Sequence, residues 1–242
     1  MGKLTIAGIG PGDRDNMTIA VDKALRAADV IVGYTVYADL IKADYPGKEF
    51  LTTAMTKEAE RCRMALDLAT QGKNVVLVCS GDSGIYGMAA LVYELRGESE
   101  IPEICILPGI TAACSGGALL GAPLTHDFTV ISLSDRLTDW ETIVKRLEHA
   151  ALADFGIVLY NPMSKGRPDH LQKACDILLR ILPANRPCGI AHAIGREGQS
   201  TKILTLGELR EAQLDMFSTV FIGNADTRVI AGKLVTPRGY RL

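Results

Sequence analysis

The chain has 242 residues, of which 48% are hydrophobic and 22% charged, and its formal net charge is −2. This composition is typical of a folded protein with one large or two small domains, and it excludes a broadly disordered chain. The near-neutral charge excludes an extended basic surface for nucleic acid, and no signal segment or membrane-spanning apolar run is visible, so we expect a cytoplasmic protein.

The six cysteines of the chain are scattered along it. They form no C-x-x-C pair and show no metal-ligand spacing, so we expect neither a metal site nor a disulfide framework. Several of them lie in apolar segments, where a cysteine behaves as a small core residue.

The first half of the chain alternates short apolar runs with helical patterns. Strands are expected at residues 4–8, 29–33, 74–79 and 103–107, and helices at residues 19–28, 56–70, 86–96 and 111–120. This order predicts a mainly parallel sheet with helices on its faces. The sequence Gly121-Ala122-Pro123 then breaks the pattern and is interpreted as a linker, which gives an N-terminal domain of residues 1–122.

The second half has a different order of elements. Strands are expected at residues 128–133, 155–160, 188–193, 202–206 and 219–223, and helices at residues 138–150 and 171–182. The sequence Thr138-Asp139-Trp140-Glu141 predicts a capping box at the first of these helices. The last strands follow one another with little helix between them, so a mixed sheet with antiparallel pairs is predicted for a second α/β domain, residues 123–242.

Residues 80–88, S-G-D-S-G-I-Y-G-M, form a glycine-rich turn between a predicted strand and a predicted helix. Glycines let a backbone approach a ligand closely, and open α/β sheets bind ligands at the carboxyl ends of their strands. Asp82 could contact a ligand or make an Asx hydrogen bond within the loop. Small or capping residues also end the strands at 8–12, 111–112 and 160–161, which indicates a pocket for a nucleoside-like cofactor.

The loop G-I-G-P-G at residues 8–12 requires a test for a dinucleotide fingerprint. The pattern G-x-G-x-x-G needs its third glycine at position 13, which is Asp13, and Pro11 lacks an N–H for a phosphate. No acidic residue ends the next strand, which runs into Gly33 and Tyr34. A nicotinamide-dependent oxidoreductase is therefore disfavoured but stays an alternative.

The order of these motifs resembles the tetrapyrrole methyltransferase family, which methylates corrin precursors and related rings from S-adenosylmethionine. The resemblance is carried by G-I-G-P-G from residue 8, S-G-D-S-G-I-Y-G-M from residue 80, P-G-I-T-A from residue 108 and L-Y-N-P from residue 159. The segments H-D-F from residue 126, I-S-L-S-D from residue 131 and G-R-E-G from residue 195 are similar to one subgroup. That subgroup methylates carbon 17 of precorrin-3B or cobalt-factor III and contracts the ring.

The resemblance implies the class III tetrapyrrole methyltransferase fold, with an active-site cleft between the two α/β domains. It also implies a tetrapyrrole substrate, a homodimer, and S-adenosylmethionine as the cofactor, released as S-adenosylhomocysteine. The cofactor contacts that it implies are Pro11, Ser80, Gly81, Asp82, Ile85, Thr111, Ala112, Asn161 and Ala193.

The resemblance also implies residues for the chemistry and for the substrate. Methyl transfer requires mainly proximity in a dry site, but ring contraction also moves a proton, which an acid or base assists. His126 is the first candidate, because histidine titrates near neutral pH. Further candidates are Asp127, Ser132, Ser134 and Asp135. Cationic side chains suited to the carboxylates of the ring are Lys57, Arg61, Arg136, Lys165, Arg167 and Arg196.

The remaining histidines are expected to have other roles. His149 and His170 lie on predicted polar helix faces and are expected in solvent, and His192 is interpreted as either a pocket or a core residue.

Two further alternatives for the function stay open. One is a relative of the same superfamily that methylates another ring carbon, RNA or diphthine, and the other is a non-catalytic tetrapyrrole carrier with this fold.

Overall fold

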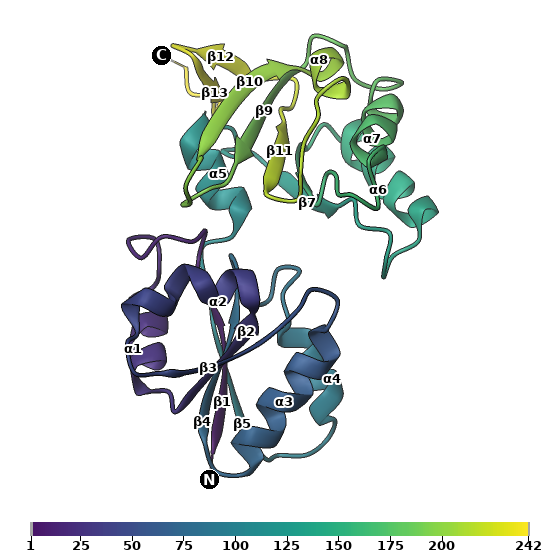
Figure 1. Ribbon diagram of the computed structural model, residues 1–242. Helices are drawn as coiled ribbons and strands as arrows, with labels where there is room; N and C mark the ends of the chain where they lie inside the picture. Colours follow the sequence, from purple (N-terminus) through teal and green to yellow (C-terminus); the bar gives the residue numbers. More distant parts are fainter. Residues whose placement is uncertain (1, 242) are drawn as a thin grey trace. The chain divides into compact units, whose positions relative to one another are not determined.

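The computed structural model describes residues 2–241. The chain divides into two compact units, Met1–Ala112 and Ala113–Leu242. Each unit is built around its own five-stranded sheet, drawn with its helices in Figure 1. Among the described residues, no helix has both the length and the apolar character that a membrane crossing needs.

The first unit contains a fully parallel sheet with strand order β3-β2-β4-β1-β5. Its strands are β1 (Lys3–Gly8), β2 (Val30–Tyr34), β3 (Glu49–Thr53), β4 (Asn74–Cys79) and β5 (Glu103–Leu107). Its helices are α1 (Ile19–Ala27), α2 (Thr35–Ile41), the short 3-10 helix η1 (Lys42–Asp44), α3 (Glu58–Thr70) and α4 (Ala89–Arg96). The predicted parallel sheet is confirmed.

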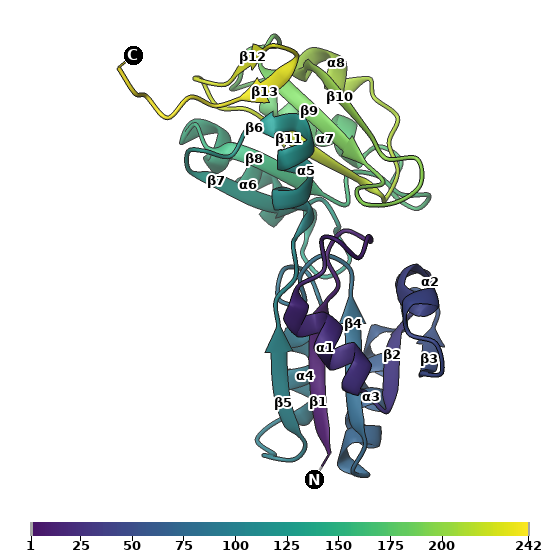
Figure 2. The ribbon, with the colours of Figure 1, turned by 90° about the vertical axis from the view of Figure 1, so that its left-hand side faces the viewer.

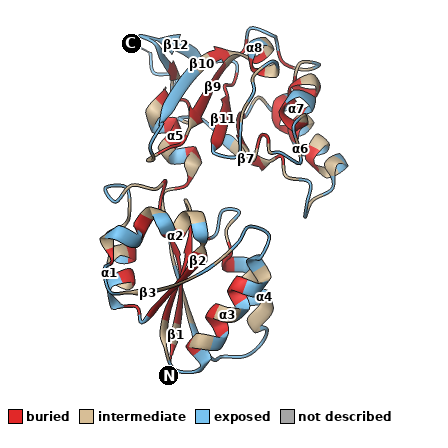
Figure 3. Ribbon diagram, viewed as in Figure 1, coloured by how far each residue is buried: buried red, intermediate tan, exposed pale blue. Residues whose placement is uncertain are grey.

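Helices cover both faces of this first sheet, because its central strands are apolar on both sides. On one face, Leu4, Ile6 and Leu77 pack with residues of α3 and α4. On the other, Ile31 and Val76 pack with residues of α1 and α2. Figure 1 shows α1 on the opposite side of the sheet from α3 and α4, and the central strands are red in the burial view of Figure 3.

The second unit contains a mixed sheet with strand order β10-β9-β11-β8-β7. β7 and β8 are parallel, and the pairs β8·β11, β11·β9 and β9·β10 are antiparallel, as predicted. The strands are β7 (Phe128–Ser132), β8 (Gly156–Tyr160), β9 (Pro187–His192), β10 (Ser200–Thr205) and β11 (Ser218–Ile222). The helices of this unit are α5 (Ala112–Leu120), α6 (Trp140–Leu152), α7 (His170–Leu178) and α8 (Leu206–Arg210).

The two faces of the second sheet are covered by different helices (Figure 2). Ile157 and Leu159 of β8 face the apolar residues of α6, α7 and α8. On the other face α5 approaches closely through Gly116, where a Cβ atom would lie 3.0 Å from Phe221 and 3.1 Å from Ala191. Because α5 packs on this sheet, the second compact unit begins before the predicted boundary at residue 122.

Residues 121–123 are not a linker, and this prediction is wrong. Gly121–Ala122 forms β6, which pairs in parallel with β13 (Lys233–Val235), and β13 pairs with β12 (Arg228–Ile230). Gly121 has φ 135, and a Cβ atom there would lie 2.7 Å from the Leu234 carbonyl. The glycine thus serves a close backbone pairing in a small third sheet, which the sequence pattern does not reveal.

The predicted capping box at α6 is also wrong, because the N-cap residue is Asp139 and not Thr138. Asp139 caps the helix, with its Oδ1 accepting from the Thr142 N–H at 2.7 Å and its Oδ2 from the Thr142 hydroxyl at 2.9 Å. Aspartate is as good an N-cap as threonine, so the helix begins one residue later than the box requires.

Candidate functional site

The carboxyl ends of β4, β1 and β5 lie side by side in the first sheet, because these strands are neighbours and parallel. The loops that follow them are residues 9–18, 80–88 and 108–111. Seven of the predicted cofactor contacts lie in or directly after these loops: Pro11, Ser80, Gly81, Asp82, Ile85, Thr111 and Ala112. The sheet topology therefore gathers them at one edge, which we call the first carboxyl edge.

Backbone atoms join the loops of the first carboxyl edge. Gly10 and Gly81 exchange two hydrogen bonds, from Gly10 N to Gly81 O at 3.1 Å and from Gly81 N to Gly10 O at 2.7 Å. Both glycines have positive φ, 74 and 65. A Cβ atom on Gly109 would lie 2.1 Å from the Gly81 carbonyl oxygen and 2.4 Å from that of Gly8. The glycines are thus needed first for the contact of one loop with another.

Asp82 organises two of these loops. Its Oδ1 accepts from the N–H groups of Gly84 at 2.7 Å and Ile85 at 3.2 Å, and its Oδ2 accepts from the Gly109 N–H at 2.9 Å. The first pair is the Asx pattern that the sequence left open, and the third bond connects the loop after β4 to the loop after β5. Asp82 is therefore a structural residue whatever else it contacts.

The side chains of the loop after β4 divide into buried and exposed groups. Ser83 is fully buried and donates to the Leu107 carbonyl at 3.3 Å, and Met88 is 9% exposed. Ile85 and Tyr86 are 42% and 56% exposed, and Tyr86 has φ 53. The loop thus exposes the side chains of Ile85 and Tyr86 to solvent, while those of Ser83 and Met88 are buried.

Cys79 ends β4 directly before this loop, and burial raises the pKa of its thiol to about 11. Cys62, Cys175 and Cys188 are buried as well. The prediction that several cysteines are core residues is confirmed, and a thiol with a raised pKa is a poor nucleophile at neutral pH.

Two predicted substrate cations lie in the first unit, in very different surroundings. Arg61 is 3% exposed; its Nη1 donates to the Thr53 hydroxyl at 2.7 Å and its guanidinium lies 5.9 Å from the centroid of the Tyr34 ring. Lys57 is exposed and lies 3.1 Å from Glu60. The burial and internal partners of Arg61 favour a structural role, in which it connects the end of β3 with α3.

In the second sheet, β7, β8 and β9 point the same way, because β9 and β8 are each antiparallel to β11, which lies between them. Their carboxyl ends therefore form a second carboxyl edge, which brings together Ser132, Asn161 and Ala193. The Asn161 amide donates to the Ser132 hydroxyl at 2.9 Å. Asn161 and Ala193 have φ 53 and 47, a conformation that costs an L-residue energy and concentrates at functional sites.

The second carboxyl edge also holds the start of α5. The Tyr160 hydroxyl accepts from the Ala113 N–H at 2.7 Å, which satisfies one of the amides that the first turn of a helix leaves without a partner. Tyr160 is the last residue of β8, so this bond fixes α5 to the end of the strand.

Two contacts join the loop after β7 to the loop after β8. Arg167 Nη1 donates to the Ser134 hydroxyl at 2.5 Å. His170 Nε2 lies 3.1 Å from Asp135 Oδ2, and its Nδ1 lies 3.2 Å from Asp169 Oδ1. The contact with Asp135 is close, although its angle is poor for a hydrogen bond. His170 holds the pKa of the Asp135 carboxyl below its ordinary value of 3.8.

His170 corrects one sequence prediction. It was expected in solvent but is only 7% exposed, and its ring packs edge-on against Trp140 with centroids 4.9 Å apart. As the first residue of α7, it faces inward between two loops rather than along the polar face of the helix. Arg136 and Lys165, two predicted substrate cations, are exposed on the loops that it connects.

His192 ends β9 and contacts Asp215, a residue that the sequence reading missed. His192 Nε2 lies 3.2 Å from Asp215 Oδ2, while Asp215 Oδ1 accepts from the Phe217 N–H at 2.9 Å and from the Ser218 hydroxyl at 3.1 Å. Desolvation raises the pKa of Asp215, but these bonds outweigh it and the net pKa lies below 3.8. Arg196, a predicted substrate cation, lies over the Phe217 ring at 5.4 Å.

The predicted catalytic residues fall into two groups. Ser132 and Asp135 lie at the second carboxyl edge, whereas His126 and Asp127 directly precede β7 at its amino end. The strand between them spans about 16 Å at roughly 3.3 Å per residue. The structure therefore does not bring His126 and Asp127 together with Ser132 and Asp135.

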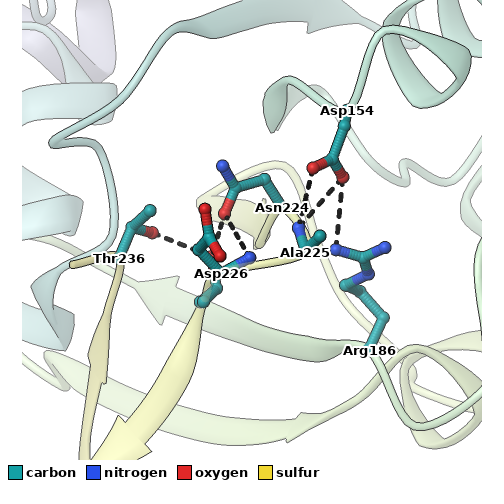
Figure 4. Close-up of polar contacts among 7 residues, drawn as sticks. Asp154, Arg186, Asn224, Ala225, Asp226 and Thr236 are labelled. Carbon is teal, nitrogen blue, oxygen red and sulfur yellow. Dashed lines mark hydrogen bonds and ion pairs between the residues drawn. The ribbon is translucent and has the colours of Figure 1, made fainter. Parts of the chain in front are cut away.

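The amino end of β8, beside His126, is occupied by a polar network of buried and exposed residues (Figure 4). Asp154 accepts from the Ala225 N–H at 2.9 Å and lies 3.3 Å from Arg186 Nη1, and Arg186 is 8% exposed. Asn224 Oδ1 accepts from the Asp226 N–H at 3.1 Å. These bonds tie the turn after β11 to the strands beneath it, and they indicate that this end of the sheet is structural.

Thr236 extends this network to the residues before His126. Its hydroxyl lies 2.8 Å from that of Thr227 and donates to the Pro123 carbonyl at 2.7 Å, and its carbonyl accepts from the Thr125 hydroxyl. Thr236 is 2% exposed. His126 therefore follows a segment that is held in place by the C-terminal strands.

The family described as Tetrapyrrole (Corrin/Porphyrin) Methylases matches residues 3–210. The chain belongs to this family of methyltransferases.

Relatives match the chain over nearly its full length. It is 46% identical over 240 residues to a "Probable cobalt-factor III C(17)-methyltransferase" of Salmonella typhimurium, covering 99% of this chain and 100% of the relative. It is 39% identical over 248 residues to a "Precorrin-3B C(17)-methyltransferase" of a Sinorhizobium species, covering 99% and 97%.

Solved structures share the fold. A crystal structure of the methyltransferase CobJ matches with a TM-score of 0.91 at 40% identity, covering 98% of this chain and 100% of that one. A uroporphyrin-III C-methyl transferase from Thermus thermophilus, complexed with S-adenyl homocysteine, matches with a TM-score of 0.72 at 21% identity, covering 92% and 97%. The predicted fold class is confirmed.

Proposed function

We propose that this chain is an S-adenosylmethionine-dependent methyltransferase of cobalamin biosynthesis. It methylates carbon 17 of precorrin-3B or cobalt-factor III and contracts the ring. The observation that carries this function is the 46% identity to a cobalt-factor III C(17)-methyltransferase along the whole length of both proteins. The oxidoreductase alternative has no support in a chain that belongs to the tetrapyrrole methylases.

The first carboxyl edge fits the cofactor. Main-chain groups of three loops meet there, with Ser80 and Thr111 adding hydroxyls and Ile85 an exposed apolar side chain that suits an adenine ring. S-adenosylmethionine supplies an electrophilic methyl group on a sulfonium centre. The loops would hold it mainly by backbone groups, together with Pro11, Gly81 and Ala112; Asn161 and Ala193 stay predicted contacts.

Asp82 can still face a cationic part of the cofactor. A carboxylate has about four acceptor positions, of which three are filled by the amides of Gly84, Ile85 and Gly109. The remaining position suits the ammonium of the methionine portion. Asp82 then both stabilises the loops and contacts the cofactor, so its replacement would disturb the loop structure and weaken cofactor binding together.

For the substrate, the second carboxyl edge offers cations on neighbouring loops. Arg136 and Lys165 are exposed, Arg167 is held by Ser134, and Arg196 lies over Phe217. Arginine and lysine suit the carboxylates that fringe a tetrapyrrole. Ser132 and Asp135 share this edge, so they are better placed for proton transfer near the ring than His126 and Asp127.

The test of the function is product formation. The purified protein is incubated under argon with S-adenosylmethionine and either cobalt-factor III or precorrin-3B, and the product is analysed by mass spectrometry for one added methyl group. Calorimetry with S-adenosylhomocysteine and NAD accompanies it. Methylation of neither ring, or binding of NAD without S-adenosylhomocysteine, would overturn the proposal.

The substrate cations are tested by charge reversal. Changing Arg136 and Lys165 to Glu together is expected to raise the KM for the ring at least tenfold, because each lost carboxylate contact also becomes a repulsion. The affinity for S-adenosylhomocysteine should not change. The matched control is Arg146→Glu, an exposed charge on α6, and a loss of cofactor affinity with an unchanged KM would remove the assignment.

The homodimer and the cytoplasmic location also stay predictions. Light scattering of the purified protein measures the first, and fractionation of the source cells measures the second.

A further inference from the structure

The four histidines of the chain have very different surroundings. His126 lies at the amino end of β7, and His149 is exposed on α6 with its Nδ1 2.7 Å from the Lys145 carbonyl. His170 is buried, with a carboxylate close to each ring nitrogen. His192 stands at the second carboxyl edge with one nitrogen engaged and a side chain that is 37% exposed. It alone of the four combines an oriented ring with access to solvent at the candidate site.

The tautomer of His192 follows from its partner. Asp215 is ionised at neutral pH because its pKa is lowered, so its oxygens only accept hydrogen bonds. The Nε2 atom of His192 must then carry the proton in the neutral ring, and Nδ1 presents a lone pair. Among the described residues Nδ1 has no hydrogen-bond partner. Asp215 is itself fixed by the Phe217 N–H and the Ser218 hydroxyl, so the ring is held by a rigid anchor.

We propose that His192 is the proton acceptor of the methylation reaction and that Asp215 is its positioning residue. This role rests on the proposed function. When a ring carbon supplies the electron pair of a new bond to the methyl group, the methyl–sulfur pair stays on sulfur and the ring gains one positive charge. The ring discharges it by losing one proton, which His192 Nδ1 accepts and later releases to water. Asp215 stabilises the imidazolium that forms in between.

The charges around His192 suit this role. Asp215 precedes β11, Arg196 lies in the loop after β9, and Lys202 is exposed on β10, two residues from the register partner of His192. Arg196 rests on the Phe217 ring. The carboxylate is thus the group in hydrogen-bond range of the imidazole, and the two cations are placed to attract an anionic substrate.

The proposal is tested with His192→Gln, assayed beside the wild type with cobalt-factor III and with precorrin-3B, each with methyl-labelled S-adenosylmethionine under argon. The side-chain amide of Gln can keep the bond to Asp215 but cannot accept a proton. We expect kcat to fall about 100-fold, with unchanged thermal unfolding and unchanged affinity for S-adenosylhomocysteine. The control His149→Gln should match the wild type. Equal turnover of wild type and His192→Gln would overturn the role, whereas a wild type that methylates neither ring would overturn the proposed function instead.

Two readouts separate proton transfer from a merely structural contact. In Asp215→Asn the imidazolium loses its counter-charge, so the low-pH limb of the kcat/KM profile should move to lower pH. Nitrogen NMR of the wild-type protein should show His192 protonated at Nε2 and unprotonated at Nδ1 at pH 8. This measurement needs no variant, so it can overturn the proposal even if the substitutions impair folding. A proton on Nδ1 would contradict the proposal.

Discussion

The two carboxyl edges of this protein are held together by different kinds of contact. In the first unit, glycine backbones contact one another and a single carboxylate binds three amides. In the second, side chains meet in pairs, such as Asn161 with Ser132, Arg167 with Ser134 and His192 with Asp215. The backbone-built edge has no room for a side chain at Gly8 or Gly109, whereas an edge of side-chain pairs responds to charge and pH. The first suits an invariant cofactor, and the second suits proton transfer and an anionic ring.

The largest expected effect comes from adding one methyl group to the first edge. In Gly109→Ala the new Cβ would lie 2.1 Å from the Gly81 carbonyl, so the loops must separate. We expect a loss of about 3 kcal/mol in the free energy of unfolding and loss of S-adenosylhomocysteine binding. Urea unfolding and calorimetry measure the two. The control Gly166→Ala, which meets nothing within 4 Å, should be neutral for stability; an equally neutral Gly109→Ala would refute the close packing.

At the second edge, one hydroxyl is expected to matter less. Tyr160→Phe removes the acceptor of the Ala113 N–H and leaves the first turn of α5 with one more unsatisfied amide. We expect a loss of about 1 kcal/mol, measured by urea unfolding. Tyr240→Phe is the control, because Tyr240 is 80% exposed. Equal stability of the two variants would mean that α5 does not depend on this bond.

A smaller effect of opposite sign is expected at Ala193. Its φ of 47 strains an alanine but not a glycine, so Ala193→Gly should stabilise the protein by about 0.5 kcal/mol after the greater chain entropy of glycine is subtracted. Ala191→Gly, at a buried position of β9 two residues earlier, should destabilise instead. Differential scanning calorimetry of both variants checks the pair. Destabilisation by Ala193→Gly would show that the methyl group contributes packing that exceeds the strain.

The smallest effect concerns pH and should be confined to the second edge. The pKa of Asp135 is lowered in the folded protein by His170, so the ionised carboxyl stabilises the fold above its ordinary pKa of 3.8. This stabilisation is lost as the pH falls through the lowered value. Asp135→Asn should therefore be less stable than the wild type at pH 7, and the difference should shrink as the pH falls below 3.8. A difference independent of pH would point to packing rather than charge.

The sequence predicted the parts of the fold that follow from periodicity. The predicted strands β1, β4, β8 and β11 and the predicted change from a parallel to a mixed sheet were correct, because each follows from the local pattern of apolar residues. β6 and β13 were missed because each is too short for a period to show. β6 pairs with β13, and this pairing joins residues far apart in the chain.

The candidate site was predicted unevenly for a similar reason. The loops of the first carboxyl edge could be predicted, since glycine and aspartate in a turn directly after a strand are recognisable from the local sequence. Asp215 and the inward direction of His170 could not, because they depend on which strand lies beside which. His126 and Ser132 are close in sequence but stand at opposite ends of one strand, so closeness along the chain was misleading there.

The bridge between Gly10 and Gly81 has a consequence for protein engineering. Groups that a main chain offers to a cofactor cannot be exchanged by substituting side chains, and both glycines have positive φ, a conformation that strains any residue with a side chain. Attempts to change the methyl donor by point mutation should therefore begin at Ile85 and Tyr86, whose side chains project from the loop. A methyl donor of a different shape would require loops of a different length.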